Sequence, residues 1–268
     1  MEEITAARIG LLLARLRERR PLVHHITNAV TVNDVANVTL AIGAAPVMAV
    51  APEEVEEMVM AAGALALNIG TLTAQAIEVM LKAGRRANAS GIPVILDPVG
   101  AGATAFRTAQ SLRLASEIRL TCVRGNAGEI AALAGRAGGV RGVDATGRVE
   151  AVDRLAADLA RRTGATVAAT GPVDVLSDGT RDVRIENGHP LLARITGSGC
   201  MATAAVAAFS AVEPDALAAA ASGLVCFEIA AECAAETARG PGTFRSALLD
   251  ALAALDAPTV LARTRLRA

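Results

Sequence analysis

Short apolar runs alternate with amphipathic stretches along most of the chain. Several of the runs are apolar at consecutive positions, which is typical of parallel strands covered by helices on both faces. Strands are expected at residues 21–26, 45–50, 64–69, 92–97, 118–123 and 165–170. Helices are expected near residues 5–19, 33–42, 53–62, 73–89, 105–115, 126–134 and 148–163. This alternation predicts an α/β fold with a mostly parallel central sheet and helices on both faces.

The pattern changes after Thr170. Two stretches of alternating polarity flank Asp178-Gly179, a dipeptide that favours a tight turn, and they predict an antiparallel hairpin. A third short strand is expected before Ile195, so that antiparallel strands extend one edge of the sheet. The rest of the chain is rich in alanine and predicts helices. Because no linker, repeat or low-complexity tract divides the sequence, residues 1–268 are expected to form one domain.

Three uncharged stretches raise the question of a membrane span: residues 35–52, 58–77 and 195–212. A helix needs about 20 predominantly apolar residues to cross a bilayer. These stretches are interrupted by glycine, proline, asparagine and glutamine, and much of their apolar content is alanine. Such interruptions would leave backbone groups unsatisfied in lipid, so we expect buried elements of an α/β protein and no membrane contact.

Charge and composition argue against a nucleic-acid partner. Lys and Arg number 26, Asp and Glu number 27, and the chain has four Phe but no Trp or Tyr. Neither a basic stripe nor aromatic stacking platforms are therefore available. The four cysteines form no C-x-x-C pair and lie in or beside apolar segments, which is typical of reduced thiols. Together with an acidic, amphipathic N-terminus, this predicts a cytoplasmic protein.

Polar or glycine-bearing turns follow five of the predicted strands. They include His25, Asn68, Asp97, Arg124 and Thr170. The carboxyl ends of parallel strands share one edge of the sheet, and ligands of open α/β sheets bind beyond that edge. The sequence therefore predicts a small-molecule site there. His24 and His25 are adjacent on a strand and must point to opposite faces, so we expect hydrogen-bonded core histidines rather than ligands.

Thr196-Gly197-Ser198-Gly199 comes directly before a run of helix-forming residues that starts at Cys200. The free N–H groups and the positive dipole end of a helix suit a phosphate or a developing oxyanion, and they would favour the thiolate of Cys200. Cys200 could then act as a base or simply as a hydrogen-bonding group facing an acceptor hydroxyl. A glycine turn before a buried helix with a packed cysteine is an equally open interpretation.

Charged residues at two strand ends suit metal-assisted phosphoryl transfer. Asp97 could hold Mg²⁺ beside phosphates, although an Asp-Pro turn is the simpler interpretation of that residue alone. Arg124 could bind phosphates. Glu129 could be a second acidic group near the metal, but its spacing from Asn126 also fits a capping box. No Walker-type loop is present, so positioning and charge neutralisation would come from these groups instead.

Six motifs together resemble the hydroxyethylthiazole kinase family of the ribokinase-like superfamily. They are HHITNAVTVNDVANVTLAIGAAPVMA at residues 24–49, LNIGTL at 67–72, PVILDPVGAGAT at 93–104, VRGNAGEI at 123–130, ATGPVDVLSDG at 169–179 and ITGSGCMATA at 195–204. The motifs occur in order over most of the chain, and the first is the most specific. The resemblance implies a three-layer α/β/α sandwich. It also implies ATP- and Mg²⁺-dependent phosphorylation of 4-methyl-5-(2-hydroxyethyl)thiazole in thiamin biosynthesis and salvage.

Alternatives within the same fold stay open at this point. One is another ribokinase-like small-molecule kinase that acts on a hydroxymethylpyrimidine or a pyridoxal-type alcohol. A second is a nucleotide-dependent dehydratase, which would form ADP without a phosphorylated acceptor. A third is a protein that binds thiazole or nucleotide without catalysis, which the acidic pair Asp97 and Glu129 disfavours.

The resemblance also implies roles for individual residues and an assembly. Thiazole contacts are implied for Met48, Gly197, Asn28 and Val30, ATP contacts for Arg124, Thr170 and Gly199, and magnesium contacts for Asp97 and Glu129. Cys200 occupies the place where sugar-kinase relatives carry an aspartate base. A homotrimer with thiazole sites between subunits is implied. Two residues depart from the family pattern, because Ala29 stands where an aromatic residue is expected and Gly128 where a serine is expected.

Overall fold

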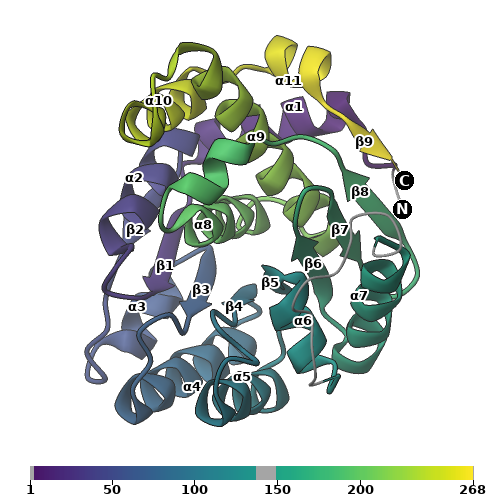
Figure 1. The fold of residues 1–268 in the computed structure, drawn as a ribbon. Helices are drawn as coiled ribbons and strands as arrows, with labels where there is room; N and C mark the ends of the chain where they lie inside the picture. The colour runs from purple at the N-terminus through teal and green to yellow at the C-terminus, as the bar shows by residue number, and fades with distance from the viewer. Residues whose placement is uncertain (1–2, 137–148, 268) are drawn as a thin grey trace.

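A nine-stranded sheet forms the centre of the protein (Figure 1), which we describe from a computed structural model covering residues 3–136 and 149–267. The strands are β1 (Leu22–Ile26), β2 (Ala45–Val47), β3 (Ala64–Asn68), β4 (Val94–Asp97), β5 (Cys122–Asn126), β6 (Thr166–Thr170), β7 (Asp174–Ser177), β8 (Asp182–Ile185) and β9 (Leu266–Arg267). Their order in the sheet is β2-β1-β3-β4-β5-β6-β7-β8-β9. Strands β1 to β6 pair in parallel, and β7 to β9 extend the sheet in antiparallel fashion.

Helices cover both faces of the sheet. They are α1 (Ala6–Arg19), α2 (Val32–Ile42), α3 (Val55–Ala61), α4 (Ala74–Ala89), α5 (Ala105–Glu117), α6 (Ala127–Leu133), α7 (Val149–Thr163), α8 (Ser198–Ser210), α9 (Ala216–Thr237), α10 (Pro241–Ala254) and α11 (Ala257–Arg263), with a 3₁₀ turn, η1 (Pro190–Arg194), before α8. The sheet curves around α8 and α9 (Figure 1). The predicted parallel α/β sheet with an antiparallel edge is thus confirmed.

Successive side chains of the central strands contribute to two separate hydrophobic layers. In β3, Leu65 and Leu67 pack with the layer of α3 to α7, whereas Ala64 and Ala66 belong to the layer that contains α1, α2, α8, α9 and α10. This is the alternation expected of strands buried on both faces. The molecule therefore has the three layers, α/β/α, that the sequence led us to expect.

Besides β2, which ends at Val47 rather than at residue 50, the structure departs from prediction at two places. The strand expected at 118–123 begins only at Cys122 and continues through the polar residues Arg124-Gly125-Asn126, which pair with β6. The prediction was wrong because Ile118 and Leu120 are buried in the core but lie outside the strand. Their apolar character reflects burial and not strand pairing. The third strand expected before Ile195 is η1 instead, where His189 caps the turn and Pro190 follows. The strand that pairs with β8 comes from the C-terminus, as β9.

The uncharged stretch 195–212 is a core helix. In α8 every residue from Met201 to Ser210 is buried, and α9 packs along it. Among the described helices, α9 alone has the length and hydropathy of a possible membrane span, and 83% of its most apolar window is buried inside the protein. Both helices are apolar on all sides because protein surrounds them.

A glycine allows α8 and α9 to lie in close contact. A Cβ atom at Gly223 in α9 would stand 2.7 Å from both Cα and N of Val206 in α8, and 2.9 Å from the carbonyl carbon of Ala205. Because the atoms it would meet belong to the backbone, no rotation of a side chain could relieve the clash. Gly223 therefore sets the distance between the two central helices.

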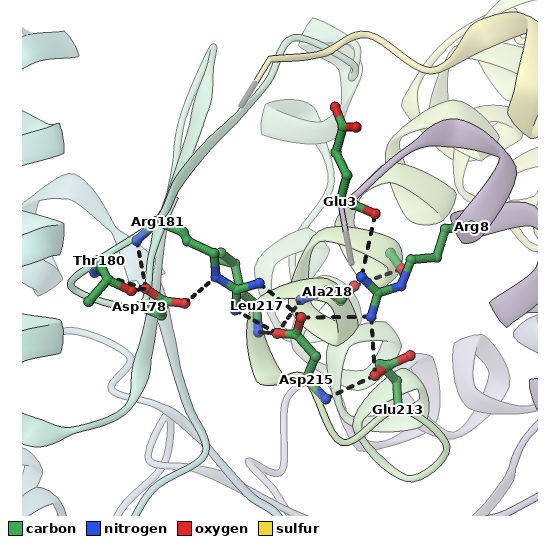
Figure 2. Close-up of polar contacts among 10 residues, drawn as sticks. Glu3, Arg8, Asp178, Thr180, Arg181, Glu213, Asp215, Leu217 and Ala218 are labelled. Carbon is green, nitrogen blue, oxygen red and sulfur yellow. Dashed lines mark hydrogen bonds and ion pairs between the residues drawn. The ribbon is translucent and has the colours of Figure 1, made fainter. Parts of the chain in front are cut away.

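An ion-pair network holds the end of the sheet that lies opposite the predicted site (Figure 2). Arg181 in the β7–β8 turn donates to Asp178 and, through both terminal nitrogens, to Asp215. Asp215 also caps α9, and Arg8 of α1 lies 3.5 Å from Glu213 and 3.7 Å from Asp215. The network joins α1, the hairpin and the turn between α8 and α9.

We expect Gly223→Ala to lower the free energy of unfolding by about 1–3 kcal/mol or more, because overpacking forces two backbones apart. Gly242→Ala is the matched control: Gly242 lies in the first turn of α10, where a Cβ would meet nothing within 4 Å. It should leave stability unchanged or raise it by up to about 1 kcal/mol. Urea unfolding followed by circular dichroism measures both. Equal stability of the two variants would contradict this explanation of the helix packing.

Candidate functional site

A cavity of about 860 Å³ lies beyond the carboxyl ends of the parallel strands. Its walls come from the turns after β4, β5 and β6, from residues 186–193 and from the start of α8. It contains seven of the ten residues predicted for the site: Asp97, Arg124, Glu129, Thr170, Gly197, Gly199 and Cys200. A cavity of a size typical for ligands therefore lies where the sequence predicts a small-molecule site.

Two asparagines connect Cys200 to Asp97. The Nδ2 atoms of Asn28 and Asn68 donate to Cys200 Sγ over 3.4 and 3.2 Å. Asn68 Nδ2 also donates to Asp97 Oδ2 over 2.8 Å, and Asn68 Oδ1 accepts from Asn28 and from the Gly70 amide. Every hydrogen-bonding position of the Asn68 side chain is thus used, which fixes its orientation.

Sequence reasoning treated Asn68 only as part of a polar turn and did not single out Thr203. Asn68 is the register partner of Asp97 across β3 and β4, and Thr203 Oγ1 donates to Asp97 Oδ2 over 2.9 Å. Thr203 lies three residues after Cys200, on the same face of α8. Two sequence features could have indicated these residues: two neighbouring strands that both end in a polar residue, and a hydroxyl one helical turn after Cys200, the candidate base.

Asp97 combines deep burial with an unused oxygen. The side chain is 1% exposed, and its Oδ1 atom has no hydrogen-bond partner among the described residues. Burial raises the pKa of Asp97 to about 6; the Arg124 charge acts against this rise and the Glu129 charge adds to it. An unsatisfied carboxylate oxygen in such a position is costly unless a ligand completes it.

Cys200 does not have the acidic thiol that its place at a helix start led us to expect. Burial raises the pKa of Cys200, and the charge of Asp97 raises it further. The hydrogen bonds donated by Asn68 and Asn28 act in the opposite direction. Helix-dipole reasoning gave the wrong direction because it omitted the burial of the thiol and, to a lesser extent, the carboxylate nearby.

Arg124 and the start of α8 form a cradle for anions. The Arg124 Nη2 group donates to Thr170 Oγ1, and its Nε atom is buried without a partner among the described residues. A Cβ at Gly199 would stand 2.5 Å from Arg124 Nη1, so only glycine allows the guanidinium to lie against the helix. Gly197 has a φ of +81°, and a Cβ atom at this position would stand 2.6 Å from Thr31 Cγ2, so glycine is required here as well. The start of α8 and the Arg124 side chain thus line one cavity.

Glu129 has a structural role in addition to its place in the cavity wall. Its Oε2 accepts from the Asn126 amide, and Asn126 Oδ1 accepts from the Glu129 amide, which completes a capping box. Its Oε1 accepts from the Gly100 amide over 2.8 Å. The capping box secures the first turn of α6 despite Gly128. Glu129 therefore joins the turn after β4 to the start of α6.

Arg107 of α5 is a further residue that sequence reasoning missed. Its Nη1 donates to the carbonyl oxygens of Ile69 and Val99, and its Nη2 donates to that of Gly70, each over 2.9 Å. These carbonyls belong to the turns that follow Asn68 and Asp97. One guanidinium thus fixes two turns of the site, although no sequence motif marks it.

The donor set suits magnesium better than a metal held by protein alone. No group of three or more His, Cys, Asp or Glu side chains able to hold a metal occurs within residues 3–136 and 149–267. Mg²⁺ usually binds through one or two carboxylates together with waters and substrate phosphates. Asp97, with a free Oδ1, and Glu129 in the same cavity provide such a set beside the anion cradle.

The three remaining predicted residues lie outside the cavity. Asn28 reaches the site through Cys200, Val30 is 65% exposed, and Met48 packs at the edge of the hydrophobic core. His24 and His25 are both buried and hydrogen-bonded, to the Ala49 carbonyl and to Thr39, and neither lines the cavity. The expectation of core histidines is confirmed. Ala29 is exposed, and its amide donates to Thr71 Oγ1.

Comparison with known proteins identifies relatives over nearly the whole chain. The model of the hydroxyethylthiazole kinase family matches residues 13–258. Hydroxyethylthiazole kinase of Methanoculleus marisnigri is 54% identical over 95% of this chain and 91% of its own. The structure of a hydroxyethylthiazole kinase from Pyrococcus horikoshii superposes with a TM-score of 0.91 at 46% identity, covering 97% and 98% of the two chains. A ribokinase-like superfamily protein from Enterococcus faecalis shares the fold, with a TM-score of 0.61 at 14% identity and 88% of each chain.

We expect Asp97→Asn to raise the free energy of unfolding more at pH 8 than at pH 5, by about 1 kcal/mol. The pKa of Asp97 is raised on folding, so its favourable contribution is complete at low pH and is lost as the pH rises through about 6. Because asparagine does not ionise, the variant does not lose this stability as the pH rises. Urea unfolding without metal or nucleotide measures the effect. Asp182→Asn, at an exposed position of β8, is the control and should show no such pH dependence; a gain for Asp97→Asn independent of pH would contradict the prediction.

Proposed function

The chain belongs to the hydroxyethylthiazole kinase family, and from this premise we propose that it transfers the γ-phosphoryl group of ATP to the hydroxyl of 4-methyl-5-(2-hydroxyethyl)thiazole. One observation carries the proposal. A single cavity joins an anion cradle, formed by Arg124 and the start of α8, to a cysteine sulfur and to a buried carboxylate with a free oxygen. In this proposal the whole chain acts as one kinase domain.

The phosphate chain of ATP is assigned to the cradle. Phosphoryl transfer depends mainly on positioning and on neutralising charge, and fixed N–H groups supply both. Arg124, oriented by Thr170 and by Gly199, would contact the phosphates through its free Nε and its terminal nitrogens. Bound Mg²⁺ would neutralise phosphate charge, with Asp97 and Glu129 as the protein groups that hold it.

Cys200 is proposed as the base that faces the acceptor hydroxyl. Its sulfur accepts hydrogen bonds from two amides, an arrangement that favours a thiolate, although burial beside Asp97 keeps the thiolate a minor form. A minor form can suffice, because in a largely dissociative transfer the hydroxyl keeps its proton until late. The proton then passes to the sulfur as the new O–P bond forms.

The thiazole site is proposed to be completed by a second subunit of a homotrimer. Two observations support this. Met48 and Val30, which the family resemblance places at the thiazole, lie outside the cavity of a single chain. Apolar side chains are also exposed on and beside α2: Val30 at 65%, Val32 at 38% and Leu40 at 56%.

A cytoplasmic location is also proposed. The four cysteines, all within the described residues, are free, which is typical of proteins in a reducing compartment.

The direct test is incubation with ATP, Mg²⁺ and hydroxyethylthiazole, with products identified by mass. The thiazole monophosphate and ADP are expected in equal amounts. A hydroxymethylpyrimidine and pyridoxal serve as competing acceptors in the same assay. Preference for either of them, or ADP without a phosphorylated acceptor, would overturn the proposal.

We expect kcat of the wild type to rise with pH above neutrality, because the pKa of Cys200 is raised and the base is its thiolate. Cys200→Ser should keep the fold, lower kcat by about a hundredfold and lose this rise. The pH profile of kcat for both proteins measures the effect, with the melting temperature as the control for folding. A Cys200→Ser variant with the turnover and pH profile of the wild type would exclude the base role.

We expect Leu40→Glu to shift the protein from trimer to monomer, because the charge would be placed on an apolar contact surface. Leu11→Glu on α1 is the matched control, since Leu11 is 71% exposed. Sedimentation equilibrium of the wild type and both variants measures the mass. A monomeric wild type, or a Leu40→Glu variant that remains trimeric, would count against the proposed assembly.

A further inference from the structure

Two carboxyl groups lie in the wall of the same cavity, apart from the residues assigned above. Asp174 is the first residue of β7, and Glu228 lies in the middle of α9. They are only 2% and 7% exposed, yet both line the cavity. Buried acidic side chains are rare unless paired, so this pair needs an explanation.

The pair has acceptor oxygens that the protein leaves free. Asp174 Oδ1 accepts from the Gly171 amide over 2.9 Å, which anchors that side chain beside Thr170. Apart from the hydrogen bond between the two carboxyls themselves, Asp174 Oδ2 and Glu228 Oε2 have no hydrogen-bond partner among the described residues. Gly188 lies beside the Glu228 carboxyl, where a Cβ would stand 3.7 Å from the carboxyl carbon.

A neighbouring glutamate shows that the free oxygens are not a general property of this wall. Glu232 lies one turn beyond Glu228 on α9. Its Oε1 accepts from Asn187 Nδ2, from the Gly188 amide and from Arg265. The structure therefore satisfies Glu232 with three N–H donors and gives Glu228, which lines the cavity, only the Asp174 carboxyl as a partner.

Burial and mutual proximity disfavour full ionisation of the pair. Burial raises the pKa of Glu228 well above its usual range, and the nearby Asp174 raises it further. Burial also raises the pKa of Asp174, which the hydrogen bond from Glu228 partly offsets. Arg124 of β5 favours ionisation of both, and Glu232 opposes that of Glu228. These raised pKa values favour a proton held between the two carboxyls.

The cavity is consequently polarised. Arg124 and the first amides of α8 attract phosphates, whereas Asp174 and Glu228 would repel them. Acceptor oxygens in a buried wall favour neutral O–H or N–H donors. In a nucleotide such donors occur only in the nucleoside half, as ribose hydroxyls or as the amino group of the base.

We propose that Asp174 and Glu228 form a subsite that accepts hydrogen bonds from O–H or N–H donors of the nucleoside half of the nucleotide. The subsite orients the nucleotide, with its phosphates toward Arg124 and its nucleoside toward β7 and α9. This inference rests on the proposed function, because it assumes that the cavity binds ATP.

The test compares ADP with inorganic pyrophosphate, which has the same phosphate chain without the nucleoside. Calorimetry gives both dissociation constants for the wild type, Asp174→Asn and Glu228→Met. We expect the preference for ADP over pyrophosphate to fall about tenfold in Glu228→Met, which has no acceptor, and in Asp174→Asn, where the remaining oxygen stays on the Gly171 amide and an NH₂ group takes the place of Oδ2. Glu228→Gln keeps a carbonyl oxygen and should keep the preference within about threefold. Glu232→Gln, at the satisfied neighbour, is the matched control and should leave it unchanged.

Nucleotide analogues distinguish the two sources of the donor. The candidates are 2′-deoxy-ADP, 3′-deoxy-ADP and the diphosphate of purine riboside, which lacks the amino group. The analogue that lacks the donor bound by the subsite should have a lower affinity than ADP for the wild type. Its affinity should fall little further in Asp174→Asn, because the analogue and the substitution remove the same hydrogen bond.

Equal weakening of ADP and pyrophosphate in Asp174→Asn and Glu228→Met, or no change in either, would overturn the subsite. Should one variant fail to fold, as judged by its melting temperature, the other gives the comparison. The proposed function is judged separately, by phosphoryl transfer in the wild type. A wild type that phosphorylates thiazole while the variants keep the full preference for ADP would remove the subsite alone.

Discussion

The buried carboxylate of Asp97 is the group on which the arrangement of the site depends. It accepts hydrogen bonds from Thr203 of α8 and from Asn68 of β3, so it joins the helix that starts at the phosphate cradle to the centre of the sheet. The same Asn68 amide reaches Cys200. Acceptor hydroxyl, metal and phosphates would therefore be positioned by one hydrogen-bonded group rather than by independent side chains.

Placing a carboxylate there has a cost that the rest of the fold must offset. An ionised group without water is unfavourable, and the raised pKa of Asp97 expresses that cost. The densely packed pair α8 and α9 behind the site contributes apolar burial in compensation. Activity and stability thus oppose each other at this residue, as is common where charge is held for catalysis.

Much of the fold could be predicted because apolar periodicity reports burial directly. The parallel strands, the hairpin and the helices follow from it, whereas β9 could not, since only tertiary contact makes a strand of Leu266–Arg267. The site could be predicted from the sequence only in part. Strand-end polarity indicated Asp97 and Arg124, but the direction of the Cys200 pKa depends on burial in the folded protein and on a carboxylate 103 positions away in the chain. Arg107 and Glu228 act through long-range contacts that no local motif records.

Helix α8 is held at both ends. Thr203 ties its first turns to Asp97, and beyond its last turn Arg15 donates to the Val212 carbonyl while Arg8 pairs with Glu213 (Figure 2). A helix fixed in this way cannot rotate its leading N–H groups when charge moves between phosphate oxygens. The solvent reorganisation that the same transfer would require in water is thereby replaced by dipoles that were already aligned when the chain folded.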